Sequence, residues 1–149
     1  MTRRGEWQPW LRDAELSLAD ARRNLRDGAW RVVCITGQLA VEMAAKAVIA
    51  AFAEPRWTHD PGEQLRSVLL ARSDTELDAA FGPSSRAALE QLAQEASEAA
   101  LWHGRATYGQ RTEDGSRLAA AEVCTEEAAR ELLGRAERAV GAAVRLRLP

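Results

Sequence analysis

The chain has 149 residues, a length that suits one domain with a core large enough to need no disulfide or metal support. Alanine, leucine and charged residues are abundant and only 5% of the residues are aromatic, a composition that favours helices over strands. The net charge of −2 argues against the broad basic surface of a general duplex-binding protein. We therefore expect residues 1–149 to form a single all-α domain.

The two cysteines, Cys34 and Cys124, lie far apart in the sequence and match neither a disulfide framework nor a zinc site. This pattern is typical of a reduced, cytoplasmic protein, and we expect no metal and no cofactor. The arginines near the N-terminus are not followed by an apolar signal segment, and nowhere do eighteen apolar residues run together. The sequence thus predicts neither export nor a membrane span.

Two long helices are predicted in the first third of the chain. Apolar residues recur at spacings of three and four over 7–25, which predicts an amphipathic helix that Gly28 closes. A second helix is expected over 30–52, with Pro55 just beyond its end. Because the link between them is short, these helices should form an antiparallel hairpin. The second is the most apolar element and should be the central one.

Three further helices are predicted between residues 60 and 101. Asp60 as N-cap, Pro61 and Glu63 begin a short helix that runs to about residue 69. Ser73 and Glu76 repeat this pattern for a brief helix that ends near residue 81. Ser84 or Ser85 then caps a long helix whose apolar positions keep helical spacing to residue 101.

The remainder of the chain is expected to be a loop followed by one long helix. The helical pattern fails from His103 to Val123, where glycines and mixed charges predict a long loop with a helical turn over 118–122. Thr125 is a plausible N-cap for a final helix that continues to about residue 144. The elements together predict an antiparallel up-and-down bundle of four to five helices. We expect its core to include Leu11, Leu18, Leu39, Val48, Leu92 and Leu133.

A polar stripe interrupts the apolar central helix. Gln38, Glu42 and Lys46 recur at steps of four, and Lys46 is the only lysine in the chain. Glu42 and Lys46 have the order of a favourable helical ion pair, and burial would make that pair a device that fixes helix register. The alternative interpretation makes Lys46 a phosphate contact that Glu42 orients. The structural interpretation is favoured, and both remain open.

This order of features resembles the HEPN family. The resemblance rests on the amphipathic first helix, on the pattern Gln38-x-x-x-Glu42-x-x-x-Lys46-Ala47, on Thr58-His59-Asp60 before a short helix, and on Arg105-Ala106-Thr107-Tyr108-Gly109 before the last helix. It implies a bundle of four or five helices, commonly a homodimer, that binds nucleotide or RNA. It also implies a small nucleotidyltransferase as partner, in a pair of the toxin–antitoxin type.

Some members of that family are ribonuclease toxins whose motif is an arginine followed, after four to six residues, by a histidine. This chain lacks the motif, because the required positions before His59 and His103 hold Phe52, Ala53 and Glu54, and Ala96, Ser97 and Glu98. An enzyme is therefore not favoured. The alternative is a ribonuclease with a rearranged site, in which His103 transfers a proton and Arg105 stabilises phosphate charge.

The segment after residue 101 carries the other candidate contacts. His103, Arg105, Tyr108 and Arg111 combine an imidazole, two guanidinium groups and a phenol, which suit phosphate binding and base stacking. The alternative for His103 is a helix C-terminus, where imidazole suits the dipole. We expect these residues and Lys46 to line one pocket between the central helix and the 103–111 loop. His59 is interpreted as a structural anchor, and the five tryptophans as core and interface residues.

Overall fold

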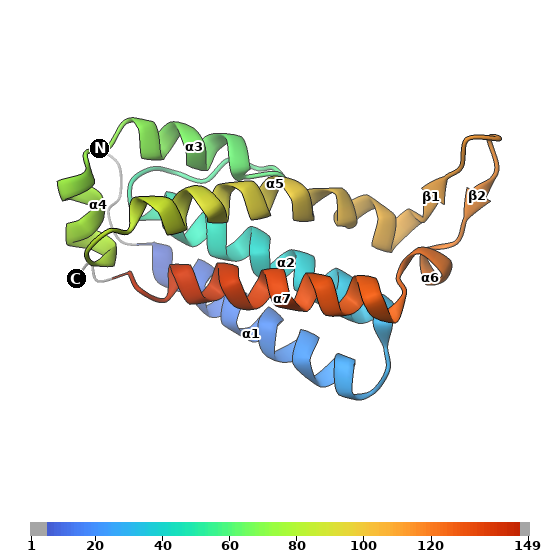
Figure 1. Ribbon diagram of the computed structural model, residues 1–149. Helices are drawn as coiled ribbons and strands as arrows, with labels where there is room; N and C mark the ends of the chain where they lie inside the picture. The colour runs from blue at the N-terminus through green and yellow to red at the C-terminus, as the bar shows by residue number, and fades with distance from the viewer. Residues whose placement is uncertain (1–5, 147–149) are drawn as a thin grey trace.

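The computed structural model describes residues 6–146 and confirms the predicted all-α bundle (Figure 1). Four long helices form its body, and three shorter helices and one small hairpin lie at its ends and side. The long helices are α1 (Trp7–Arg26), α2 (Trp30–Ala50), α5 (Arg86–Tyr108) and α7 (Glu126–Ala143). The short helices are α3 (Gly62–Leu70), α4 (Asp74–Phe81) and α6 (Ala120–Val123), and the hairpin pairs β1 (Gln110–Arg111) with β2 (Arg117–Leu118).

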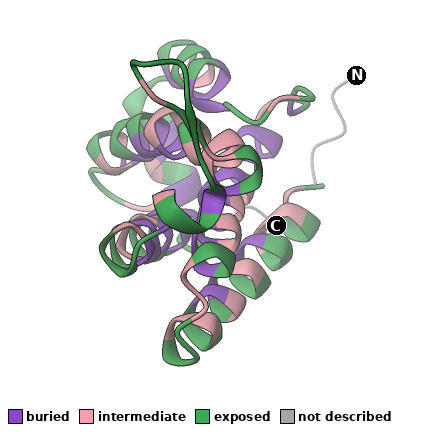
Figure 2. Cartoon of the chain, turned by 90° about the vertical axis from the view of Figure 1, so that its right-hand side faces the viewer, coloured by how far each residue is buried: buried purple, intermediate pink, exposed green. Residues whose placement is uncertain are grey.

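Helix α2 is the centre of the bundle, as the sequence predicts. It packs against α1, α5 and α7, and most of its residues are buried. Gly37 allows α7 to lie close to α2, because a Cβ atom at this position would lie 3.3 Å from the Cβ of Leu132 on α7. Helix α2 is long and apolar enough to cross a membrane, but its burial is that of a core helix. Figure 2 shows the buried positions facing inward between the long helices.

Several predicted helix boundaries are confirmed by their capping bonds. Gly28 follows α1 with a φ of 72°, the left-handed conformation that glycine adopts most easily. Ser73 and Glu76 form the predicted capping box of α4. The Thr125 hydroxyl accepts a hydrogen bond from the Ala128 amide at 3.1 Å and begins α7.

Two predicted caps differ in detail. Helix α3 begins one residue later than expected, with Pro61 at the N-cap position, and the Asp60 carboxylate accepts the Gly62 amide proton at 3.1 Å. The Ser85 hydroxyl makes no capping bond to α5, because it donates to the Asp78 carboxylate at 3.2 Å. At both helix starts an aspartate carboxylate still accepts a backbone amide proton, from Gly62 at α3 and from Ser85 at α5.

The predicted loop over 103–123 is wrong in its first part. Helix α5 continues to Tyr108, although Gly104 weakens helix propensity there. Packing explains the extension, since Ala106 is buried and the Arg31 side chain of α2 donates to the Ala106 carbonyl at 2.9 Å. Gly109 then ends the helix with a φ of 79°.

The remainder of the predicted loop is a short antiparallel hairpin that projects beyond the end of α5 (Figure 1). The Asp114 carboxylate accepts bonds from the Ser116 amide and hydroxyl at 2.9 and 2.7 Å and closes the turn. Bonds from Thr112 and Ser116 lower the pKa of Asp114 to about 2. A Cβ atom at Gly109 would lie 2.0 Å from the Leu118 carbonyl oxygen, so the return strand leaves room only for glycine. The predicted helical turn over 118–122 is α6, shifted to Ala120–Val123.

An ionic cluster around the buried Glu95 carboxylate joins α5 to α7. The Glu95 carboxylate is buried and receives the Arg135 and Arg138 guanidinium groups at 2.7 and 3.0 Å. Arg135 also binds Glu98 and Glu131. The carboxylate is thus compensated on the side of α5 that faces α7.

Four of the six residues that were predicted to lie in the core are buried. Leu18, Val48, Leu92 and Leu133 are buried, but Leu11 and Leu39 are only half-buried. Leu39 belongs to a stripe on the side of α2 that no other helix covers completely. The stripe consists of Val32, Ile35, Leu39 and Met43, and we call it the open face of α2.

This burial predicts unequal costs for truncating two leucines. Leu92→Ala should lower the free energy of unfolding by about 2–5 kcal/mol, because Leu92 is almost fully buried. Leu39→Ala should cost clearly less, since part of its side chain already contacts water. Urea denaturation of both variants checks this, with Leu16→Ala, at an exposed site, as the control. Equal losses for Leu39→Ala and Leu92→Ala would contradict the placement of Leu39.

Candidate functional site

The polar stripe of α2 is buried and fully connected. The Gln38 amide donates to Glu42 Oε2 at 2.9 Å, and the Lys46 ammonium donates to Glu42 Oε1 at 3.0 Å. All three side chains are buried, and Glu42 retains only 3% of its surface. Because a buried carboxylate is costly without a partner, Lys46 and Gln38 keep Glu42 inside the bundle. These contacts are those of the structural interpretation of the stripe.

The chain that follows α2 folds back over the stripe. His59 Nδ1 lies 3.4 Å from Glu42 Oε2 and brings an imidazole to the buried carboxylate. The buried Gln64 side chain of α3 fixes the same segment. It donates to the Glu54 carbonyl at 2.8 Å and accepts from the Arg56 amide at 2.9 Å. Residues 54–59 are therefore held in place although they form no helix.

The second histidine reaches the same network from α5. The rings of His59 and His103 are stacked, with centroids 3.6 Å apart and planes inclined by 16°. The stack connects His103 to Glu42 through His59. The contacts of His59 thus extend beyond the anchoring role that the sequence suggested.

A cavity of about 420 Å³ lies above the stripe. Glu42, Lys46 and His59 contribute to its lining, and the Trp10 ring of α1 lies 5.3 Å from the Lys46 ammonium. The Trp57 side chain at the cavity is fully exposed. The lining consists of Trp10, Glu42, Met43, Lys46, Glu54, Pro55, Arg56, Trp57, Thr58 and His59.

The wall of this cavity differs from the one predicted. The 103–111 segment was expected to face Lys46, but residues 54–59 occupy that position. The physical reason is that residues 103–108 continue α5, while the chain leaving α2 covers the stripe directly. The sequence pattern did not indicate that Trp10 and residues 54–59 form the wall of this cavity. The available signal was a helix-free segment with a proline and a tryptophan immediately after the central helix.

The other predicted contacts lie along the end of α5 and in the hairpin. The Arg105 guanidinium lies 5.4 Å from the centre of the Trp102 ring, a cation–π contact. Tyr108 is 68% exposed, and Arg111 is exposed in β1. Arg105, Tyr108 and Arg111 do not line the Lys46 cavity. The predicted contacts are thus divided between a cavity and an open surface that the histidine stack connects.

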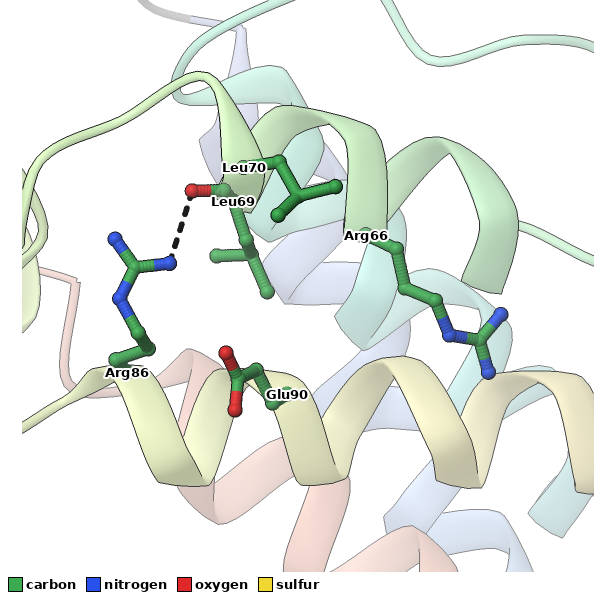
Figure 3. A pocket seen from close by; sticks show the side chains of 5 residues that line it. All are labelled: Arg66, Leu69, Leu70, Arg86 and Glu90. Atoms are coloured by element: carbon green, nitrogen blue, oxygen red, sulfur yellow. Dashed lines mark hydrogen bonds between the residues drawn. The ribbon is translucent and has the colours of Figure 1, made fainter.

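A second cavity of about 300 Å³ lies between α3 and α5 (Figure 3). Arg66 and Arg86 stand at its two sides, with Leu69, Leu70 and Glu90 between them. Arg86 donates to the Leu69 carbonyl at 3.0 Å and also binds Asp74. Arg66 donates to Ser97 and Gln94 at 3.2 Å. Because these guanidinium groups already hold the helices together, the Lys46 cavity is the better candidate site.

Within residues 6–146, no cluster of three or more histidine, cysteine, aspartate or glutamate side chains could hold a metal ion. Cys34 and Cys124 are free and buried, and burial raises the pKa of both thiols. Their chemistry is therefore that of inert protonated thiols.

Comparison with known families identifies the fold. The family model described as the HEPN domain matches residues 7–146, nearly the whole chain. This match supports a nucleotide- or RNA-related module in general terms. No curated protein matches the chain.

The buried ion pair predicts a difference between single and double substitutions. Lys46→Met should destabilise the protein by roughly 3–5 kcal/mol, because it leaves the Glu42 carboxylate buried without its cation. The double variant Glu42→Gln/Lys46→Met should recover most of this loss, since glutamine carries no charge and still bonds to Gln38. Urea denaturation of both variants measures the difference. Equal destabilisation of the single and double variants would show that the pair does not compensate charge.

Proposed function

Because the chain belongs to the HEPN domain family, we propose that it is a nucleotide- or RNA-binding and interaction module. The observation that carries this proposal is the Lys46 cavity, where buried hydrogen-bonding groups face an open space beside aromatic rings. Concave sites with a few convergent polar groups in an apolar lining are the usual form of a small-molecule site. An ion pair that served only to fix the register of α2 would need no cavity beside it.

The donors of Lys46 support a ligand at this position. An ammonium group carries three N–H donors, and among the described residues Lys46 makes one hydrogen bond, to Glu42. The same ammonium group makes a cation–π contact with the Trp10 ring. Donor capacity is left for a ligand atom in the cavity.

Side chains outside the cavity suit the remainder of a nucleic acid strand. His103 adjoins the cavity through His59, and Arg105, Tyr108 and Arg111 continue along α5 and the hairpin. Guanidinium groups bind phosphate in a forked geometry, and an exposed phenol stacks on bases. This arrangement fits a single strand better than a duplex, because the protein is slightly acidic overall.

The protein is further proposed to act as a homodimer. Trp7 and Trp10 are half-buried, and Trp10 lies against the Lys46 ammonium, so these two side chains offer little apolar surface to a second copy. The open face of α2 offers a better surface, since its four apolar side chains remain partly in water. Covering this stripe with a second copy removes apolar surface from water.

A cytoplasmic location and a small nucleotidyltransferase partner, in a pair of the toxin–antitoxin type, complete the proposal. The two cysteines, which match no disulfide framework, support the location. The resemblance of the sequence to paired HEPN proteins supports the partner. Co-purification of the tagged chain with a nucleotidyltransferase encoded beside it tests the partner.

The second candidate function is a ribonuclease. The stacked His59 and His103 rings beside Glu42 favour it, because two imidazoles can act as general base and general acid. Arg105 lies at the Trp102 ring, and its role would be phosphate binding along α5. RNA fragments that appear with the protein and disappear with His103→Ala would support this alternative.

Loss of exposed arginines should weaken RNA binding and its salt dependence. Arg105→Ala and Arg111→Ala should each lower affinity for a labelled single-stranded RNA, and the salt slope should fall by roughly 0.7–1 unit per lost phosphate contact. Fluorescence anisotropy across a salt series measures both. Arg66→Ala, in the second cavity, is the matched control and should leave the slope unchanged. Equal slopes for all three variants would count against this surface.

The dimer proposal predicts that one charged substitution in the interface halves the mass of the particle in solution. Leu39→Glu should convert a two-chain particle into a single chain, because it places a carboxylate in the middle of the open face. Light scattering after size exclusion gives the mass, and circular dichroism checks that the helices remain. Leu16→Glu, an exposed position on α1, is the control. A single-chain mass for the unaltered protein at micromolar concentration would reject the homodimer.

A further inference from the structure

We infer that the Lys46 cavity takes a neutral planar ring, the base of a nucleoside, while any phosphate stays outside. The inference rests on the proposed function and assigns one part of the nucleotide to one part of the site. It follows from the charge balance, the hydrogen-bonding groups and the aromatic walls of the cavity.

The charges that line the cavity cancel. The lining includes two acidic residues, Glu42 and Glu54, and two basic residues, Lys46 and Arg56. The deeper pair, Glu42 and Lys46, is already joined at 3.0 Å. A phosphate brought to Lys46 would also meet the buried Glu42 carboxylate. Because a charge placed against the buried Glu42–Lys46 pair would lose hydration without gaining a net opposite charge, the deep end of the cavity favours a neutral group. Lys46 then acts through its free N–H donors and does not supply a net charge.

The deep end of the cavity offers a donor beside an acceptor. Lys46 provides N–H groups, and the Glu42 carboxylate accepts hydrogen bonds. The edges of nucleobases carry ring nitrogens or carbonyl oxygens beside amino or imino groups, which is the complementary pattern. A base that enters edge-first can therefore satisfy both residues without altering their pairing. A phosphodiester, or the dianion of a phosphomonoester, has only acceptor oxygens and can therefore satisfy only Lys46.

The sides of the cavity suit the faces of a ring. Trp10, Met43 and Pro55 line it with apolar surface. Trp57 belongs to the same lining, yet its side chain is fully exposed. Gln64 and His59 hold the backbone around it, so rotation of the Trp57 side chain alone could close the ring into the cavity. Stacking would remove this indole from water and cover the base. The volume of about 420 Å³ lies within the range of small-molecule sites.

Titration with uncharged nucleosides tests the inference. Adenosine, guanosine, cytidine and uridine are compared with their 5′-monophosphates at low and high salt, by calorimetry and tryptophan fluorescence. At least one nucleoside should bind within about threefold of its monophosphate, and its affinity should be independent of salt, since no phosphate contact is involved.

Three variants locate the bound base. Trp57→Ala should weaken nucleoside binding about tenfold through loss of stacking, and Trp57→Phe should retain most of it. Leu70→Ala, at another exposed apolar site, on α3, is the control and should have no effect. Glu42→Gln/Lys46→Met, which keeps the charge balance, should abolish the preference among bases.

The outcomes separate this inference from the proposed function. Binding of monophosphates or RNA without nucleoside binding, or binding unaffected by Trp57→Ala and by the double variant, would overturn the inference and leave the proposed function standing. Absence of binding to nucleosides, nucleotides and single-stranded RNA would overturn both. Salt-independent nucleoside binding that requires Trp57 would support both.

Discussion

The burial of Glu42 in the central helix is the constraint on which the candidate site depends. A carboxylate in this position must be compensated, and compensation comes from one residue a turn before it, one a turn after it, and one from the segment that folds back. The position of residues 54–59 is thereby coupled to the register of α2. His59 then meets His103, so the end of α5 is coupled to the same carboxylate. One buried charge thus connects three parts of the chain that are distant in sequence.

The sequence predicts the helices well where local chemistry decides their limits. Ser73 and Thr125 begin helices because their hydroxyl groups accept nearby amide protons, and Gly28 ends one because it tolerates a positive φ. Prediction fails where tertiary packing outweighs propensity. Helix α5 passes through Gly104 because Ala106 is buried against α2 and bonds to Arg31. Neither contact is visible in a local pattern.

The candidate site is predictable only in part for the same reason. The steps of four between Gln38, Glu42 and Lys46 show that these side chains share one side of a helix, and the structure places them together. The opposing wall depends on how the chain leaves α2, which periodicity does not encode. His59 and Trp10 reach the stripe through folding of separate segments, and Arg105 turns to Trp102 although it is two residues from His103. Helical geometry explains this divergence, because positions two apart point to nearly opposite sides.

The burial of the single lysine has a consequence for chemical modification. Lys46 is 5% exposed and engaged with Glu42 and Trp10, so an acylating reagent can reach this side-chain amine only through the Lys46 cavity, and an acetyltransferase is too large to enter it. Acylation would also remove the charge that compensates Glu42, so a modified molecule could not close again without cost. The rate at which Lys46 becomes labelled therefore reports how easily a small molecule enters the cavity between α1, α2 and the 54–59 segment. Labelling of Lys46 is thus a chemical measure of access to the cavity.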